Sequence, residues 1–130
     1  MRLVSPIHIY LPRKRSRDKK ISLNLNWYRN AHYRENNEVK KMYLRIMAPT
    51  LNSLPRFKVM PVTIHYKLFP AVMCDGANVA SIVSKFFLDA LVKCTNIPDD
   101  NLKFVAGESW SYGGIDKKNP RCEITIEGGR

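Results

Sequence analysis

The sequence predicts one α/β (α+β) domain, residues 1–130, in which a mixed sheet of about four strands packs against two helices. Apolar residues alternate with polar ones in several segments, which is typical of strands with one buried face. Two other segments, 30–47 and 78–94, repeat apolar residues at three-and-four spacing, which is typical of amphipathic helices. Along the chain these patterns predict the order β-α-β-α-β-β.

The first strand is expected over residues 3–11, because Ile9 and Leu11 belong to an alternating run that Pro12 ends. A basic loop or arm follows at about 12–28. Its first half is a run of charged side chains without an apolar face, so we expect it to be mobile. The alternation of Leu and Asn near its end fits either a short strand or a loop.

The central and C-terminal elements follow the same two patterns. The first helix is expected to end near Met47, because Pro49 follows it. The second helix is expected over 78–94, with an apolar stripe centred on Val83 and Phe86. The remaining strands are expected over 57–69, 102–110 and 121–127.

Positive charge is concentrated in the first half of the chain. The net charge of +11 and the pI of about 9.8 predict a polyanionic partner. Residues 1–60 contain 14 Lys and Arg and 3 Asp and Glu, whereas residues 61–130 contain 8 and 8. This segregation favours a nucleic-acid-binding surface over a uniformly solvated basic exterior. The expected phosphate contacts are Arg13, Lys14, Arg15, Arg17, Lys19, Lys20, Arg29 and Arg34.

Aromatic side chains follow the basic arm. Trp27 and Tyr33 would stack on unpaired bases if they are exposed, or anchor the core if they are buried. The three cysteines are far apart and show no C-x-x-C spacing, which fits a reducing compartment and argues against a disulfide framework or a zinc site. No apolar run has the length of a membrane span, and the N-terminus lacks a signal-peptide core. We therefore expect a soluble intracellular protein without a membrane partner.

Carboxylates in the second half suggest a metal site. Asp75 stands between a short apolar run and the second helix, and Asp99 and Asp100 follow that helix. If the two loops converge, their oxygens suit Mg²⁺, which binds phosphate oxygens alongside carboxylates. Each acid also has an ordinary explanation, because Asp75 is a favourable helix cap and the Asp99–Asp100 pair suits a turn.

A polar line runs along the second helix beside its apolar stripe, through Asn78, Ser81, Lys85 and Asp89. Active-site groups often lie on such a line, which is equally the ordinary boundary between the buried and exposed faces of a helix. Lys85 and Asp89 are four residues apart, so they can pair.

The chain resembles the RusA-type Holliday junction resolvases, which are small phage and prophage endonucleases, in one ordered set: Asp75, Asn78, Lys85 to Leu91, and Pro98 to Asp100. Leu11-Pro12 and the segment from Asn24 to Arg29 are similar to that family's substrate-facing segment. The resemblance implies a RusA-like fold, a homodimer, a bacterial cytoplasmic location, and Mg²⁺ or Mn²⁺ as cofactor. It implies cleavage of four-way DNA junctions in recombination, repair or phage DNA processing.

By this resemblance, Asp75 and Asp100 would bind the metal and Lys85 would support catalysis. The chain departs from the family at Ala77, where the family has a second carboxylate, and the helix up to Lys85 is longer by about one turn. The missing ligand would then come from Asn78, Asp89 or Asp99.

If no ligand replaces the missing carboxylate, cleavage is poor and DNA binding is retained. The alternative function is therefore a non-catalytic, structure-specific nucleic-acid-binding protein that uses the basic first half. A protein-binding scaffold is a third hypothesis, and it predicts binding without steep salt dependence.

Overall fold

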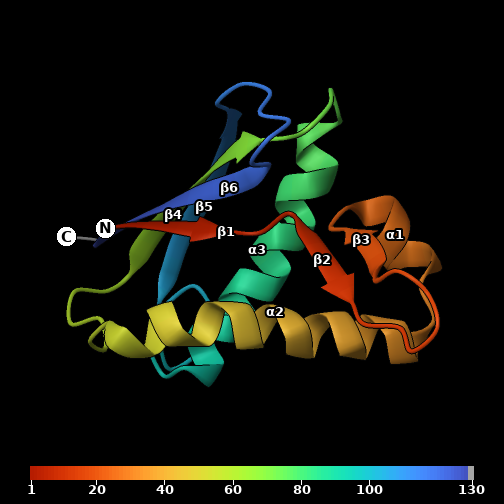
Figure 1. The fold of residues 1–130 in the computed structure, drawn as a ribbon. Helices are drawn as coiled ribbons and strands as arrows, with labels where there is room; N and C mark the ends of the chain where they lie inside the picture. The colour runs from red at the N-terminus through yellow and green to blue at the C-terminus, as the bar shows by residue number, and fades with distance from the viewer. Residues whose placement is uncertain (129–130) are drawn as a thin grey trace.

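A four-stranded mixed sheet forms the centre of the computed structural model, which describes residues 1–128. Strand β4 runs parallel to β5 and antiparallel to β6, and β1 runs antiparallel to β6. Helix α3 packs against β4 and β5, and α1 and α2 pack against α3 (Figure 1). The spatial order of the sheet is β1 (Arg2–Ser5), β6 (Arg121–Gly128), β4 (Val62–Phe69) and β5 (Val105–Tyr112). The helices are α1 (Leu25–Asn30), α2 (Tyr33–Ser53) and α3 (Gly76–Lys93).

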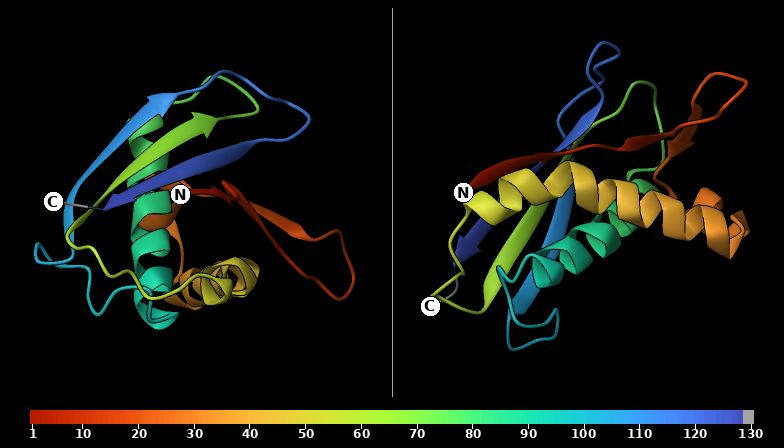
Figure 2. Two further views of the ribbon diagram at one scale, coloured as in Figure 1. Left: turned by 90° about the vertical axis from the view of Figure 1, so that its left-hand side faces the viewer. Right: turned by 60° about the horizontal axis from the view of Figure 1, so that its bottom comes forward.

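This arrangement confirms the mixed α+β class and the sheet of four strands, with three helices in place of the expected two. The left view of Figure 2 looks onto the sheet with α3 behind it. Side chains on the helix side of β4 and β6 are buried, among them Tyr66 and Ile124. Those on the opposite side, such as Lys67 and Glu123, are exposed or half-buried.

The prediction of one strand over residues 3–11 was wrong. The alternation itself is correct, since Leu3, Ile9 and Leu11 are all buried. The strand breaks at Pro6, however, so that β1 pairs with β6 while β2 (His8–Leu11) pairs with β3 (Lys19–Ser22) in a separate hairpin. Proline has no N–H to donate to a strand ladder, which lets the chain leave the main sheet at this point.

The basic arm is consequently a hairpin and not a mobile loop throughout. Buried Ile9 and Ile21 face each other across β2 and β3, and only the segment 12–18 between the strands is a fully exposed loop. Helix α1 begins near the end of the arm. The Asn24 side chain caps it by accepting a 2.8 Å hydrogen bond from the backbone N–H of Trp27. A polar residue beside buried Leu23 thus serves as a cap, which alternation alone did not predict.

The prediction that the first helix stops before Pro49 was also wrong. Helix α2 continues through Pro49 to Ser53. Buried Met47 and Leu51 lie on either side of the proline and hold this turn against the core. Asn96 also donates a 3.0 Å hydrogen bond to the Leu51 carbonyl near the end of the helix. Tertiary packing therefore outweighs the local cost of the proline.

Replacing Pro49 by Ala is expected to raise the free energy of unfolding by about 1–2 kcal/mol, because proline in a helix interior costs up to about 3 kcal/mol relative to Ala. Pro49 is exposed, so the substitution removes no core contact. Urea denaturation measures the change. Thr50→Ala, on the same exposed turn, should shift stability by less than about 0.5 kcal/mol. A Pro49→Ala protein no more stable than the wild type would contradict this account.

Helix α3 agrees well with expectation. Its apolar stripe packs into the core, with Val83, Phe86 and Ala90 all buried. The helix starts at Gly76, two residues before the expected start, because Asp75 caps it. The three cysteines are free, and burial raises the pKa of the Cys122 thiol to about 12. Within residues 1–128, no helix combines the length and apolar character needed to cross a membrane.

Candidate active-site carboxylate and nucleic-acid interface

Asp75 stands at the point where the loop after β4 turns into α3. One oxygen of its side chain, Oδ1, accepts a 3.2 Å hydrogen bond from the backbone N–H of Ala77, so the residue is the N-cap of the helix. The ordinary explanation of Asp75 as a cap is therefore confirmed. The residue is exposed, and its other carboxylate oxygen has no hydrogen-bond partner among residues 1–128. The cap thus leaves one oxygen free for a ligand.

The backbone on both sides of Asp75 is held by one side chain of β5. The Tyr112 hydroxyl donates a 2.8 Å hydrogen bond to the Cys74 carbonyl and accepts a 2.6 Å hydrogen bond from the Gly76 N–H. The hydroxyl therefore acts both as donor and as acceptor, and it fixes the backbone of the residues before and after Asp75. A helix cap does not need this additional support. The contact is typical of a functional site, in which surrounding residues hold a side chain in a defined position.

Gly76 lies directly against the rings of Trp110 and Tyr112, and there is no room for a side chain at this position. A Cβ at this position would lie 2.3 Å from one ring carbon of Trp110 and 2.8 Å from the Tyr112 ring. The two rings meet edge to face, with centroids 5.1 Å apart. Sequence reasoning missed Gly76, Trp110 and Tyr112. The available signal was an aromatic pair at the end of a strand followed by Gly113-Gly114, but nothing in the sequence joins that pair to Asp75.

The structure does not bring Asp99 and Asp100 to Asp75 within one chain. Asp75 precedes α3 and the acidic pair follows it, and the 18 residues of the helix separate the two ends by about 27 Å. The side chain of Asp99 accepts hydrogen bonds from the Asp100 N–H and from Asn101. The turn explanation of Asp99 is therefore confirmed, and the two loops do not converge within a single chain.

Lys85 is also distant from Asp75, at about 15 Å along the axis of α3. Its ammonium group lies 5.3 Å from the centre of the Tyr28 ring in α1, a cation–π contact. Asp89 does not pair with Lys85 but forms ion pairs with Lys40 of α2 and Lys93. This agrees with a structural role for Asp89.

Asn78 lies in the first turn of α3, where its backbone carbonyl accepts a hydrogen bond from Ser81. It is the one expected ligand near Asp75. Within the described residues 1–128, no group of three or more His, Cys, Asp or Glu side chains could hold a metal ion. The donors of one chain therefore do not fit the Mg²⁺ site that the family resemblance implies, either at Asp75 or at Asp99 and Asp100.

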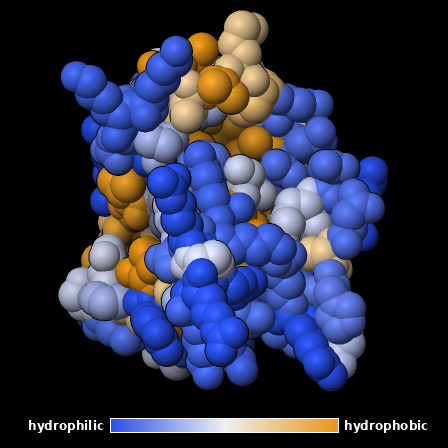
Figure 3. Space-filling model, turned by 45° about the vertical axis from the view of Figure 1, so that its right-hand side comes forward, coloured by the Kyte–Doolittle hydropathy of each residue, from blue (hydrophilic) through white to orange (hydrophobic). Residues whose placement is uncertain are grey.

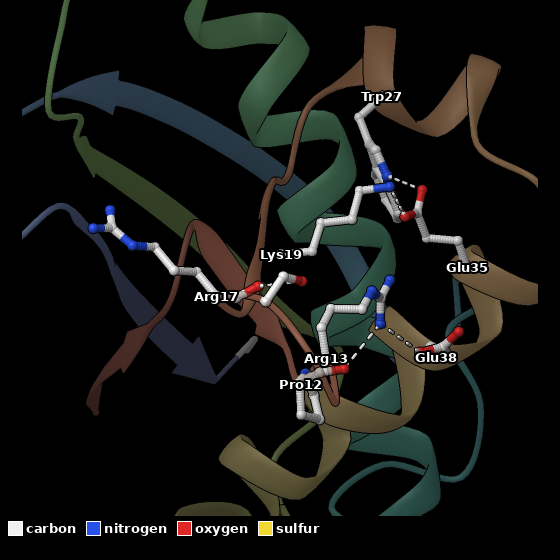
Figure 4. A network of polar contacts seen from close by, with 8 residues as sticks. Pro12, Arg13, Arg17, Lys19, Trp27, Glu35 and Glu38 are labelled. Carbon is white, nitrogen blue, oxygen red and sulfur yellow. Dashed lines mark hydrogen bonds and ion pairs between the residues drawn. The ribbon is translucent and has the colours of Figure 1, made fainter.

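The cationic residues expected to contact phosphates come together at one end of the molecule. The hairpin, α1 and the start of α2 lie side by side there (Figure 1). Two of the cations are tied to α2, since Arg13 pairs with Glu38 at 3.7 Å and Lys19 pairs with Glu35 (Figure 4). Among residues 1–128, four exposed cations of the hairpin form no ion pair: Lys14, Arg15, Arg17 and Lys20.

Glu35 connects the hairpin to both helices at this end. Its carboxylate accepts hydrogen bonds from Lys19 and, at 3.3 Å, from the Trp27 indole N–H (Figure 4). The hydrogen bond from Lys19 is the main reason that the pKa of Glu35 lies below its ordinary value of 4.5. Trp27 is half-buried against Phe86, so its ring anchors the core and is not an open stacking surface.

The Glu35 contact is expected to be lost in acid. A carboxyl group whose folded pKa is lowered stabilises the fold above its unfolded pKa, and this contribution disappears as the pH falls through the folded value. The Trp27 indole N–H resonance should therefore shift with a midpoint below pH 4.5. The Trp110 indole is the internal control, and Glu35→Gln should abolish the Trp27 transition. A Trp27 resonance unchanged down to pH 3 would contradict the assignment.

Two other expected phosphate contacts flank the hairpin. Arg29 is exposed in the last turn of α1. Arg34 begins α2, where its guanidinium lies 5.9 Å from the centre of the exposed Tyr33 ring. Tyr33, unlike Trp27, is therefore available to stack on a base. Figure 3 shows that one face of the protein is largely hydrophilic, with apolar side chains at its upper end and along its left edge.

The loop that leads to Asp75 borders the base of the hairpin. Residues 70–72 and Cys74 line a cavity of about 270 Å³ together with His8, Lys20 and Ser22. The supported carboxylate and the cationic hairpin therefore adjoin each other. No protein-family model matches this chain, and no curated protein matches it.

Proposed function

We propose that this protein binds branched DNA through its basic hairpin and cleaves it as a homodimeric, metal-dependent endonuclease of the RusA type. The exposed cations of residues 13–20 would neutralise backbone phosphates. Phosphate contacts fix position and shape without reading sequence, which suits a substrate defined by its branching. Asp75 would then face the backbone from the neighbouring loop.

The observation that carries this proposal is the position of Asp75 relative to the hairpin. The loop before Asp75 lines the same cavity as the base of the hairpin, so a DNA strand bound to the hairpin would pass near a carboxylate with a free oxygen. The Tyr112 hydroxyl holds the backbone on both sides of Asp75. A carboxylate held beside a phosphate-binding surface would otherwise only repel the ligand, which favours a role in cleavage.

Two chains are needed if Asp75 and Asp100 act on one metal ion. The helix between them places these residues too far apart within one chain. In a two-fold dimer, Asp75 of one protomer can lie near Asp100 of the other, and symmetry then produces two equal sites. Two such sites match the two symmetric strands of a four-way junction.

A non-catalytic DNA-binding protein is the second candidate. It is favoured by the absence of a three-residue metal cluster among residues 1–128 and by the alanine at position 77. In this case the hairpin alone accounts for the function. The two candidates differ in one result, which is cleavage.

Incubation of a labelled four-way junction with the wild-type protein tests the proposal directly. With Mg²⁺ or Mn²⁺ we expect paired, symmetric nicks, and with EDTA we expect binding alone. Binding should weaken with a slope of about −5 in log affinity against log salt if about six phosphates are neutralised. Binding without nicks in either metal would support the second candidate, and a flat salt response would exclude both.

Mixed dimers test the shared site. Asp75→Asn and Asp100→Asn proteins, each expected to be inactive alone, are refolded together in equal amounts. Half of random dimers are then mixed and carry one intact site, so nicking should return to about a quarter of the wild-type rate. If both carboxylates act within one chain, no activity returns. If either variant nicks normally by itself, that carboxylate is not part of the site.

A further inference from the structure

The cavity between the hairpin and the Asp75 loop contains polar groups that the cleavage proposal does not use. It measures about 270 Å³, which is room for several water molecules at ~30 Å³ each in the liquid. Its polar lining comes from both strands of the hairpin and from the residue that caps α1. Its apolar lining comes from the residue before β2, the Asp75 loop and the start of α3. The polar residues are His8, Lys20, Ser22 and Asn24, and the apolar ones include Ile7, Ala71, Val72 and Val79.

Three of these polar residues have a polar group without a hydrogen-bond or ion-pair partner among residues 1–128. His8 bonds to the Ser22 hydroxyl through Nδ1 at 3.0 Å, and its Nε2 is buried without a partner. Asn24 uses its carbonyl oxygen to cap α1, which leaves its NH₂ group unused. Lys20 forms no ion pair within this part of the chain. If Ser22 donates to Nδ1, the neutral ring of His8 carries its proton on Nε2, and in the imidazolium Nε2 carries a proton in any case.

We propose that this cavity is a subsite for a single backbone phosphate of the bound nucleic acid. The proposal rests on the branched-DNA function above, which it makes more specific. The unused groups of His8, Lys20 and Asn24 are all donors, and a phosphate group offers only acceptors. The apolar part of the lining suits the deoxyribose next to that phosphate.

The carboxylates nearby agree with this assignment. No Asp or Glu lines the cavity, although Asp75 follows Cys74, which does. The phosphate would therefore lie beside Asp75, the proposed metal ligand, which is not part of the lining. This position would set how the strand enters the proposed cleavage site.

Protonation of His8 supplies a readout of occupancy. Burial, and next the charge of Lys20, lower the pKa of His8 below its ordinary value of 6.5. Cys74 is the other titratable group on the lining, and burial raises its thiol pKa, so it is neutral near pH 7. An anion in the cavity would stabilise the imidazolium and raise the pKa of His8.

The test uses junctions in which one phosphate at a time is replaced by a neutral methylphosphonate. In the wild type, one position near the branch point should lower affinity about tenfold when neutralised. In Lys20→Gln that position should lose its effect. In the matched control Lys14→Gln, which removes an equal charge from the hairpin loop, the effect should remain. Identical positional profiles in Lys20→Gln and wild type would overturn the subsite.

An NMR titration of the His8 ring separates the two sources of phosphate and the two proposals. Junction DNA should raise the pKa of His8, and His8→Gln should weaken junction binding without changing the salt slope contributed by the loop cations. A response of His8 to inorganic phosphate but not to DNA would show a free-phosphate site and overturn the proposal. If the protein binds no DNA, the branched-DNA function is wrong. If the pKa of His8 also does not change with inorganic phosphate, the phosphate subsite is wrong independently of that function.

Discussion

Replacing Asp75 by Asn is expected to lower metal-dependent nicking of a four-way junction by at least about 100-fold. Loss of a residue that only supports a metal ligand costs up to about 100-fold, so loss of a ligand itself should cost at least as much. The substitution keeps the shape of the side chain and an oxygen for the Ala77 N–H, and Asn caps helices about as well as Asp. Stability should therefore change by less than about 0.5 kcal/mol. Removing a negative charge beside the DNA should leave binding unchanged or slightly tighter.

Asp75→Ala separates the two roles of this residue. It removes the cap as well as the carboxylate, so it should cost about 1 kcal/mol of stability in addition to the loss of nicking. Nicking rates under single-turnover conditions and thermal denaturation of both variants provide the comparison. Wild-type nicking by Asp75→Asn would mean that the residue is only a cap.

Replacing Gly76 by Ala is expected to lower the free energy of unfolding by about 1–3 kcal/mol, the usual cost of forcing a methyl group into filled space. The new Cβ would overlap the rings of Trp110 and Tyr112. Moving either ring disturbs the hydrogen bonds that fix the backbone around Asp75. Urea denaturation should show the loss of stability, and nicking should fall with it.

Gly107→Ala is the matched control for this substitution. It lies on the same strand as the two rings, and a Cβ at that position would meet nothing within 4 Å. Its stability should equal or exceed that of the wild type. Trp110→Leu combined with Gly76→Ala should recover part of the loss, because the smaller side chain makes room for the methyl group. Equal stabilities for Gly76→Ala and Gly107→Ala would refute the clash.

The sequence predicted those elements in which local pattern and packing agree. The stripe of α3 and the alternation of β4 and β6 are regular, so their period identifies the buried face correctly. Two of the errors in the predicted elements concern prolines. Pro6 breaks a run whose alternation continues unbroken, and Pro49 lies in a helix whose apolar spacing continues beyond it. Whether a proline ends an element depends on packing from distant segments.

The candidate site was predictable only in part for a related reason. Asp75 could be found from its place between an apolar run and a helix. The sequence left open whether Asp75 and Asp100 converge, because residue spacing does not show which ends of an element meet, and in one chain the full length of α3 stands between them. The support from Tyr112 joins residues 36 positions apart, from Gly76 to the end of β5, so no local pattern contains it.

The pairing of β1 with β6 has a consequence for how the chain folds. It joins Leu3 to Ile124, so the sheet cannot be completed until the two ends of the described chain have met. Closing so long a loop costs entropy before any contact repays it. The segment β1 should therefore dock late, on a slow folding phase of milliseconds or longer. The α2–α3 pair, which is closer in sequence, can form earlier.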